Sequence, residues 1–246
     1  MTILVGVLCK DGIVIGSDSS ATFSDGTSPT IEQPCKKVHI IGSDVIVAGA
    51  GAVGLSQRFN AIVESKLSGG HHKNKAHIET AKQICAACIS DFNSTQAPGG
   101  AFGALLAFAT NSSFHLCEFD INTLQPEFKT DSLWYVSMGS GQQIADPFLG
   151  LIRRVFWKSG PPSLREGIFS VTWTLHHSIE VNPGGVNGPP QIAILQEDPR
   201  GHFAATLLDD KDLGEHVDNV KAAERYLADY RNIMHGISDK TIPEPS

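Results

Sequence analysis

The chain opens with Met1-Thr2-Ile3-Leu4-Val5-Gly6-Val7, an apolar run that carries a hydroxyl residue at its second position. Removal of Met1 would leave Thr2 with its hydroxyl and a free α-amine on the same residue. An unperturbed α-amine has a pKa near about 8, so a useful fraction of it is uncharged at neutral pH. Such an amine can act as the base that activates the hydroxyl of its own residue, an arrangement used in nucleophilic catalysis. A Met-Thr start is also common in ordinary termini, so this hypothesis needs support from the rest of the chain.

Two later segments are expected to bring an acid and a cation to the same place. Asp11-Gly12 forms a hairpin signal between two apolar runs, and the return strand carries Asp18 back alongside the terminus. After a loop rich in Ser, Thr, Asp and Gly, Lys37 precedes a third apolar run at 38–41. We therefore expect a hydroxyl, a carboxylate and an ammonium at neighbouring strand ends.

These segments resemble, in order, the motifs of the proteasome β-subunit family of N-terminal-nucleophile hydrolases. That family opens with Thr and continues with a DG-type turn, an A-D-S-R-A-T-like stretch, a Lys-Lys-apolar step, an A-G-x-x-x-x-x-Q segment and a G-S-G step. The matching segments here are Thr2, Asp11-Gly12, Ser17–Thr22, Lys36-Lys37-Val38, Ala50–Gln57 and Met138-Gly139-Ser140-Gly141. No single match is specific, but their order is hard to obtain by chance. The resemblance covers residues 2–210 of the chain.

The resemblance implies a threonine endopeptidase and assigns roles to particular residues. The implied catalytic residues are Thr2 as nucleophile, Lys37 as the cation beside it, Asp18 as the carboxylate that orients the lysine, Gly51 as oxyanion donor and Ser140 beside the terminal amine. The implied substrate-binding residues are Ser20, then Thr22, whose backbone pairs with an extended substrate, and the residues of the specificity pocket, which are Ala21, Cys35, His39, Gly49 and Val53. Glycine at position 49 should leave that pocket open.

Two features depart from the family pattern. Members often carry an Asp and a Ser three residues apart before Gly-Gly, where this chain has Glu180-Val181-Asn182-Pro183-Gly184-Gly185. We assign Glu180 to the catalytic set as the counterpart of the aspartate, although Pro183 lacks the serine hydroxyl and the loop also aligns one step differently. The family's Arg after Asp-Ser is Ser20 here. Only Met1 precedes the threonine, and with the long final helix this places the chain nearest to bacterial proteasome homologues such as the betaproteobacterial proteasome homologue.

Composition restricts the class of protein further. The chain has 246 residues, 41% of them hydrophobic and 18% charged, and a net charge of −7. These values are ordinary for a soluble globular protein, and the acidic balance argues against a nucleic-acid partner. No apolar stretch has the length of a membrane span, and no secretory signal opens the chain. We therefore expect a cytoplasmic protein with no nucleic-acid or membrane partner.

The cysteines and histidines do not predict a metal site or a cofactor. Five cysteines do not suit a fully paired disulfide framework. Cys85 and Cys88 have redox spacing, but no second CxxC is present after them, and their helical periodicity predicts two small core positions. His71 and His72 are expected in a solvated loop. We assign no metal and no cofactor.

The order of apolar patterns predicts the fold class. Strands are expected at 2–10, 12–18, 37–41, 45–49, 104–109, 114–119, 127–130, 134–138, 191–196 and 202–207, and helices from 55, at 76–93, at 141–157, after the capping box 163–166 and at 212–233. Strand groups separated by helix pairs suggest two stacked antiparallel sheets with helices on both outer faces, an α+β arrangement. The resemblance implies the same four-layer αββα sandwich. We expect one domain over residues 1–246, with a loose tail from about 237.

The resemblance also implies partners, and alternatives stay open. It implies a homo-oligomeric ring, two rings stacked, with Thr2 facing an inner chamber and unfolded polypeptides as substrates. An AAA+ unfoldase is implied by analogy alone. The alternatives are a non-catalytic ring subunit and a small-molecule amidase with the same threonine chemistry. Each residue also has an ordinary alternative: Asp18 in a turn, Lys37 as a surface charge and Ser140 as a helix N-cap.

Overall fold

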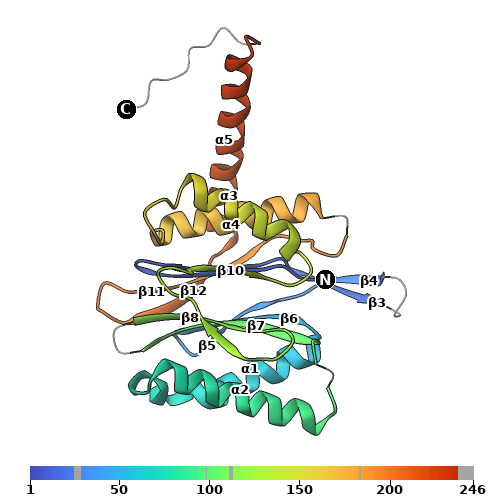
Figure 1. Ribbon diagram of the computed structural model, residues 1–246, viewed down its shortest axis with the longest axis vertical. Coiled ribbons are helices and arrows are strands. Elements are labelled where there is room, and N and C mark those ends of the chain that lie inside the picture. The colour runs from blue at the N-terminus through green and yellow to red at the C-terminus, as the bar shows by residue number, and fades with distance from the viewer. Residues whose placement is uncertain (25–28, 98, 111–112, 183, 238–246) are drawn as a thin grey trace.

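The computed structural model describes residues 1–24, 29–97, 99–110, 113–182 and 184–237 (Figure 1). Its strands are β1 (Leu4–Cys9), β2 (Gly12–Ser17), β3 (Ser20–Ser24), β4 (Pro29–Pro34), β5 (Val38–Ile41), β6 (Val45–Gly51), β7 (Phe102–Thr110), β8 (Ser113–Phe119), β9 (Pro126–Phe128), β10 (Tyr135–Met138), β11 (Gln191–Glu197) and β12 (Phe203–Leu207). Its helices are α1 (Val53–Leu67), the short 3-10 segment η1 (Ser68–Asn74), α2 (His77–Ser94), α3 (Gln142–Val155), α4 (Leu164–Val181) and α5 (Asp210–Met234). Pro183 and the expected tail after residue 237 lie outside the described residues.

Two antiparallel sheets are stacked between two helical layers. One sheet has the strand order β10-β1-β2-β11-β12 and the other has the order β5-β6-β7-β8-β9. Figure 1 shows α3 and α4 on the outer face of the first sheet and α1 and α2 on the outer face of the second, with α5 extending away from the layers. The four-layer α+β sandwich predicted from the sequence is confirmed.

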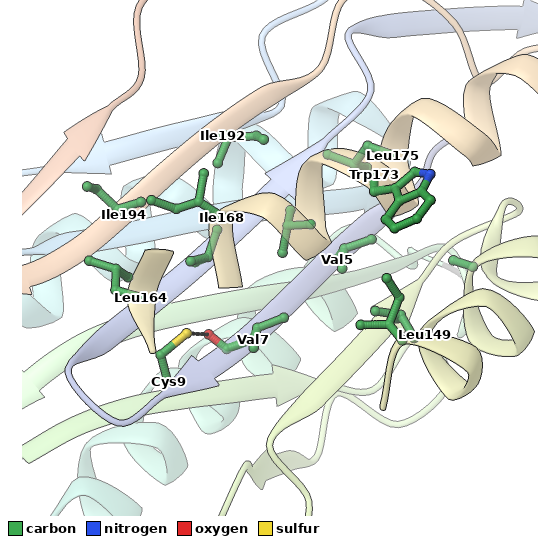
Figure 2. Close-up of a cluster of buried hydrophobic side chains, with 14 of the residues drawn as sticks. Val5, Val7, Cys9, Leu149, Leu164, Ile168, Trp173, Leu175, Ile192 and Ile194 are labelled. Carbon is green, nitrogen blue, oxygen red and sulfur yellow. Dashed lines mark hydrogen bonds between the residues drawn. The ribbon is translucent and has the colours of Figure 1, made fainter. Parts of the chain in front are cut away.

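The apolar residues of β1 alternate between two buried faces. Leu4 points into the cluster between the two sheets, whereas Val5 and Val7 pack against α3 and α4 (Figure 2). Successive side chains of a strand point to opposite faces, so a strand covered on both sides must be apolar throughout. This explains the unbroken run at the start of the chain, and burial of each such side chain contributes about 1.5–3 kcal/mol.

The β1–β2 hairpin fixes the position of the first helical layer. Cys9 pairs with Gly12, so the turn consists of Lys10 and Asp11. Asp11 Oδ1 accepts a hydrogen bond of 2.6 Å from the N–H of Leu164, the first residue of α4. An N–H at a helix start has no partner within the helix, so the turn carboxylate satisfies it and attaches α4 to the hairpin.

One predicted loop is a hairpin in the structure. The segment after Asp18 was expected to be irregular, but β3 and β4 pair there as a separate two-stranded sheet, with Phe23 opposite Ile31. Aromatic and β-branched residues within the polar stretch pair across the hairpin, although both side chains are largely exposed. The hairpin projects beside the N-terminus (Figure 1).

The helical layers correct one further expectation and confirm another. The loop that contains His72 is the 3-10 segment η1, and the His72 side chain is buried with Nδ1 at 3.1 Å from the Leu67 carbonyl. Pro147 lies inside helix α3. Cys85 and Cys88 are buried in the cluster between α1, α2 and the second sheet, as their helical spacing predicted.

Candidate active site

The candidate nucleophile lies where the β1–β2 hairpin returns to the start of the chain. Leu4 pairs with Ser17, so Asp18, directly after β2, lies beside Ile3. The Ile3 N–H donates to Asp18 Oδ1 at 3.0 Å, and the Asp18 N–H donates to the Ile3 carbonyl at 3.4 Å. The pairing therefore holds the aspartate next to the residue that comes after Thr2.

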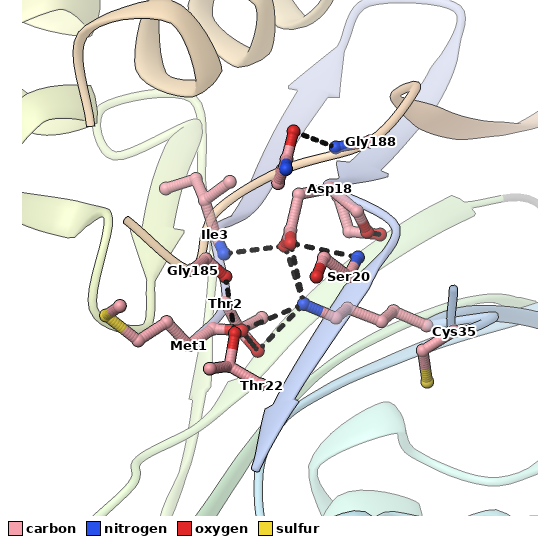
Figure 3. A network of polar contacts seen from close by, with 12 residues as sticks. Met1, Thr2, Ile3, Asp18, Ser20, Thr22, Cys35, Gly185 and Gly188 are labelled. Atoms are coloured by element: carbon pink, nitrogen blue, oxygen red, sulfur yellow. Dashed lines mark hydrogen bonds and ion pairs between the residues drawn. The ribbon is translucent and has the colours of Figure 1, made fainter. Parts of the chain in front are cut away.

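Lys37 brings an ammonium to the same corner from the start of β5. Its Nζ donates to both carboxylate oxygens of Asp18, each at 2.8 Å, and to Thr2 Oγ1 at 3.1 Å (Figure 3). The Lys37 side chain is 6% exposed and that of Asp18 is fully buried. The structure thus brings Thr2, Asp18 and Lys37 into contact, and neither Asp18 nor Lys37 is a solvated surface charge.

Burial and pairing act on the lysine in opposite directions. Removal from water lowers the pKa of Lys37, and the charge and hydrogen bonds of Asp18 oppose that effect without cancelling it. The carboxylate also accepts the N–H of Ser20 at 3.2 Å, so main-chain donors fix its orientation. A buried ammonium with a lowered pKa and a specific charge partner, 3.1 Å from a hydroxyl, has the features of a functional-site candidate.

Ser140 contacts the backbone of the candidate nucleophile. Its Oγ accepts the N–H of Thr2 at 3.0 Å and donates to the Thr2 carbonyl at 3.4 Å. The N-cap of α3 is Gly141 and has no side-chain cap, so Ser140 is not the helix cap that was the alternative. The neighbouring glycines permit the close approach, because a Cβ at Gly139 would collide with the Thr2 carbonyl and one at Gly141 would lie 2.9 Å from Ile3.

The carbonyl of Met1 takes part in the same network. Thr2 Oγ1 donates to it at 2.8 Å and Lys37 Nζ donates to it at 3.0 Å. With Met1 attached, the nitrogen of Thr2 is a peptide N–H and has no basic lone pair. The hydroxyl and the cation are in place, whereas an amine base on Thr2 requires removal of Met1.

A pocket of about 500 Å³ opens beside Thr2. Six residues that the resemblance assigns to substrate binding line it: Ala21, Thr22, Cys35, His39, Gly49 and Val53. A Cβ at Gly49 would collide with Ser56 Oγ, so the glycine keeps the pocket open. Ser20, the seventh residue, is buried instead, where its N–H holds Asp18 and its hydroxyl donates to Glu32.

Gly51 lies where this pocket meets the nucleophile. Its φ of +107° is a conformation that glycine adopts without strain. A Cβ at this position would collide with the carbonyl oxygen of Ala101. Glycine is therefore required where the end of β6 packs against the Ala101 backbone, and the role of Gly51 as oxyanion donor stays a prediction.

The structure does not bring Glu180 to this cluster. The residue lies in the last turn of α4 with its side chain 62% exposed, and a carboxylate oxygen lies 3.7 Å from Nδ1 of His176. None of the contacts described for Thr2 comes from Glu180, and Pro183 lies outside the described residues. The catalytic role assigned to Glu180 therefore has no support from these contacts.

The loop after α4 contributes to the site through its backbone. The Asn187 carbonyl accepts the N–H of Ser19 at 3.1 Å, and the Gly185 carbonyl accepts the Thr22 hydroxyl at 3.3 Å. These bonds hold the start of β3 against the loop.

Gln191 is a residue of the site that the motifs did not reveal. Its side-chain oxygen accepts the N–H groups of Lys37 at 2.8 Å and Val38 at 3.2 Å, and its amide nitrogen donates to the Cys35 carbonyl at 2.9 Å. The side chain therefore fixes the segment that presents the lysine. The available signal was a glutamine at the start of an apolar strand, but nothing in the spacing links it to a residue 154 positions earlier.

Neither a metal cluster nor a membrane helix occurs among the residues that the structure describes. Within those ranges, no group of three or more His, Cys, Asp or Glu side chains has the arrangement to hold a metal ion. None of the helices described is both long and apolar enough to cross a membrane.

The fold is the four-layer αββα sandwich of the N-terminal-nucleophile type. Two solved structures of this architecture superimpose on nearly the whole chain. Anbu, an ancestral β-subunit from Yersinia bercovieri, has a TM-score of 0.71 with 14% identity and covers 99% of both chains. The Gly-1 mutant of Anbu from Hyphomicrobium sp. strain MC1 has a TM-score of 0.69 with 14% identity and covers 98% of this chain and 100% of its own.

The chain belongs to the proteasome subunit family, whose model matches residues 2–150. Proteasome subunit beta type-7 of Dictyostelium discoideum is 32% identical over 153 residues, which are 58% of this chain and 50% of the relative. The probable proteasome subunit beta type-2 of Schizosaccharomyces pombe is 28% identical over 147 residues, with the same two shares. The match with this chain thus spans about half the length of these relatives.

Proposed function

We propose that the protein is a threonine-type peptidase subunit that cleaves peptide bonds with Thr2 as its first residue. The observation that carries the proposal is the buried contact of Lys37 Nζ with Thr2 Oγ1 and with both oxygens of Asp18. A buried ion pair beside a hydroxyl at a pocket edge is typical of an activated nucleophile. A plain structural ion pair does not require a hydroxyl in contact with its cation.

The proposed reaction uses groups of this chain alone. The Thr2 amine accepts the hydroxyl proton as Oγ1 attacks the substrate carbonyl carbon, and the charge of Lys37 stabilises the developing alkoxide. The Gly51 backbone stabilises the oxyanion, a contribution typically worth about 3 kcal/mol. The peptide C–N bond then breaks, the amine returns its proton to the leaving nitrogen, and the acyl group remains on Oγ1 as an ester. Water hydrolyses this ester by the reverse proton route.

The pocket supports a peptide as the substrate. Ala21, Thr22 and Phe23 of β3 run along one side of it. An extended peptide can add to such a strand through main-chain hydrogen bonds, while a side chain enters the pocket. A small amide would leave the strand unused. We therefore place the amidase alternative second.

Assembly and partners form part of the same proposal. We propose that the subunits form a homo-oligomeric ring and that two rings stack to enclose the Thr2 sites. The enclosed chamber admits unfolded polypeptides, which an AAA+ unfoldase delivers. The proposed compartment is the cytoplasm. Family membership supports the ring, and the single domain over residues 1–246 is proposed with it. Sedimentation that finds only monomer at micromolar concentration would contradict this part.

The contacts of Met1 favour one alternative state. Because the Met1 carbonyl accepts both Thr2 Oγ1 and Lys37 Nζ, a subunit that retains Met1 is latent and serves the ring as a scaffold.

The test compares three preparations in a peptide-hydrolysis assay: protein released from a fusion directly before Thr2, protein that retains Met1, and the Thr2→Ala variant. We expect cleavage from the first preparation alone. Equal cleavage by all three would overturn the proposal.

A further inference from the structure

A second pocket adjoins the nucleophile. It has a volume of about 400 Å³ and lies between the end of β8, the end of β10 and the start of α3. Among the described lining residues, the two pockets share Met1, Thr2 and Gly51 and no others. They therefore meet at the reacting hydroxyl, and an extended substrate that crosses Thr2 reaches both.

The charges of the two pockets are opposite. Lys36, Lys37 and His39 are among the described residues that line the first pocket, and no carboxylate is. Glu118 and Asp120 line the second, where no Lys, Arg or His side chain is among the described lining residues. Lys37 is paired with Asp18, and burial lowers the pKa of His39, so the positive charge of the first pocket comes from Lys36. A substrate that spans Thr2 thus meets this ammonium on one side and two carboxylates on the other.

The two carboxylates of the second pocket differ in how they are held. Glu118 pairs with Lys129 at 2.7 Å, and Lys129 also pairs with Glu127, so this group of three carries a net charge of −1. Asp120 Oδ1 accepts the N–H groups of Asn122 and Thr123 and the hydroxyl of Thr123, all neutral donors. The hydrogen bond from the Thr123 hydroxyl is the largest cause of a lowered pKa of Asp120, and the N–H groups add to it. Asp120 therefore stays ionised at neutral pH. The negative charge at the pocket is therefore not cancelled.

We propose that the second pocket binds a lysine or arginine side chain directly after the scissile bond, with Asp120 as the residue that determines this specificity. Met138 and Ile121 also line the pocket and offer apolar surface to the methylene stem of such a side chain. The carboxylates of Asp120 and Glu118 then receive its charged end. A glutamate at the same substrate position would face two like charges.

The assignment to the leaving-group side rests on the proposed function. There the first pocket takes the side chain before the scissile bond, since β3 and the open Gly49 position lie on that side. The second pocket, across Thr2, then receives the residue that leaves with the amine. The same argument predicts that a basic side chain before the scissile bond is disfavoured, because the Lys36 ammonium lies there.

The test uses peptides that share every residue except the one after the scissile bond. That residue is lysine, norleucine, which has a similar stem without the charge, or glutamate. We expect kcat/KM to be about three- to tenfold higher for lysine than for norleucine, the range of a partly exposed charge pair, and lowest for glutamate. The preference should shrink when salt is added, which a purely steric preference would not do.

Two matched variants identify the residue responsible. Asp120→Asn keeps the oxygen that accepts the turn hydrogen bonds and removes the charge, so the lysine-to-norleucine ratio should fall towards one. Asp198→Asn is the control, because Asp198 accepts the N–H groups of Arg200 and His202 in a similar turn and does not line the pocket. The control should keep the wild-type ratio.

Each outcome separates the pocket from the chemistry. Three results would overturn the pocket assignment and leave the peptidase proposal standing. They are a lysine-to-norleucine ratio near one in the wild type, an unchanged ratio in Asp120→Asn, and a preference for lysine before the scissile bond. Absence of cleavage of every peptide by protein that begins at Thr2 would overturn the peptidase proposal, and the pocket assignment with it.

Discussion

The ion pair between Asp18 and Lys37 gives the sharpest prediction about stability. Asp18→Asn removes the carboxylate and leaves an ammonium that is 6% exposed. In the wild-type structure, Asp18 accepts two hydrogen bonds from Lys37 and one each from the N–H groups of Ile3 and Ser20. The asparagine amide nitrogen donates only, so at least one of these donors loses its acceptor. Breaking a buried pair in this way typically destabilises a protein by about 3–5 kcal/mol.

Urea unfolding at neutral pH measures this loss against two controls. Asp44→Asn breaks a pair in which Lys73 is 42% exposed, so it should be much less destabilising. Asp18→Asn combined with Lys37→Met removes the ammonium as well and should recover part of the stability, a non-additive result. A loss below about 1 kcal/mol for Asp18→Asn, or strict additivity in the double variant, would refute this account of the pair.

The pH dependence of the same variant has a definite sign. The pKa of Lys37 is lowered by burial and raised by Asp18, so it falls further when the carboxylate is removed. Where the unfolded chain binds the lysine proton and the folded variant does not, stability rises with pH. The pH range that matters lies between the pKa of Lys37 in the folded variant and its pKa in the folded wild type. As the pH is raised through this range, the loss of unfolding free energy caused by Asp18→Asn should become smaller. A loss that grows with pH would contradict this.

Three further predictions concern the nucleophile, a half-buried histidine and the glycine proposed as oxyanion donor. Lys37→Ala should reduce peptide hydrolysis nearly as much as Thr2→Ala, and the two losses should not add because the residues act as one unit; Thr2→Ser should retain some activity. Burial, aided by the charge of His77 stacked on it, lowers the pKa of His115 to about 4. As the pH falls from about 6.5 to about 4, the unfolded chain therefore protonates His115 and the folded chain does not, which destabilises the fold. The urea midpoint should fall over this pH range, and His115→Gln should make that fall smaller. Gly51→Ala should destabilise by about 1–3 kcal/mol in urea unfolding, because its φ is positive and the Ala101 carbonyl fills the space of a Cβ. Gly54→Ala, in α1 with open space around it, is the control and should be neutral or stabilising.

Local patterns predicted the layers of the fold well, because apolar periodicity reports which face of an element is buried. The strand β2 and the capping box of α4 were located from spacing and composition alone, and Ser163 accepts the N–H of Glu166 as expected. The β3–β4 hairpin was missed because its strands join neither main sheet and are rich in polar residues. Strand pairing outside a core leaves a weak periodic signal.

The site was predictable only as far as motif order carried it. Pairing within the β1–β2 hairpin places Asp18 beside Ile3, so the approach of Asp18 to Thr2 could be inferred from local pattern, whereas Lys37 joins them from the start of β5 and was assigned by motif order. Gln191 meets Lys37 across 154 residues, and Glu180 fails to meet Thr2, because both depend on how distant segments pack. No local pattern reports such packing.

The most direct measurement is covalent labelling of Thr2 by an electrophile that bridges a hydroxyl and a neighbouring amine, such as an epoxyketone, with the adduct located through peptide mapping by mass spectrometry. Protein that begins at Thr2 should carry one adduct per chain on the N-terminal peptide, joined through both Oγ1 and the amine. Protein that retains Met1 and the Thr2→Ala variant should carry none. Absence of the adduct from correctly folded protein with a free Thr2 would contradict the central claim and leave the non-catalytic ring subunit as the better account. Equal labelling of Lys37→Ala would contradict the role assigned to Lys37.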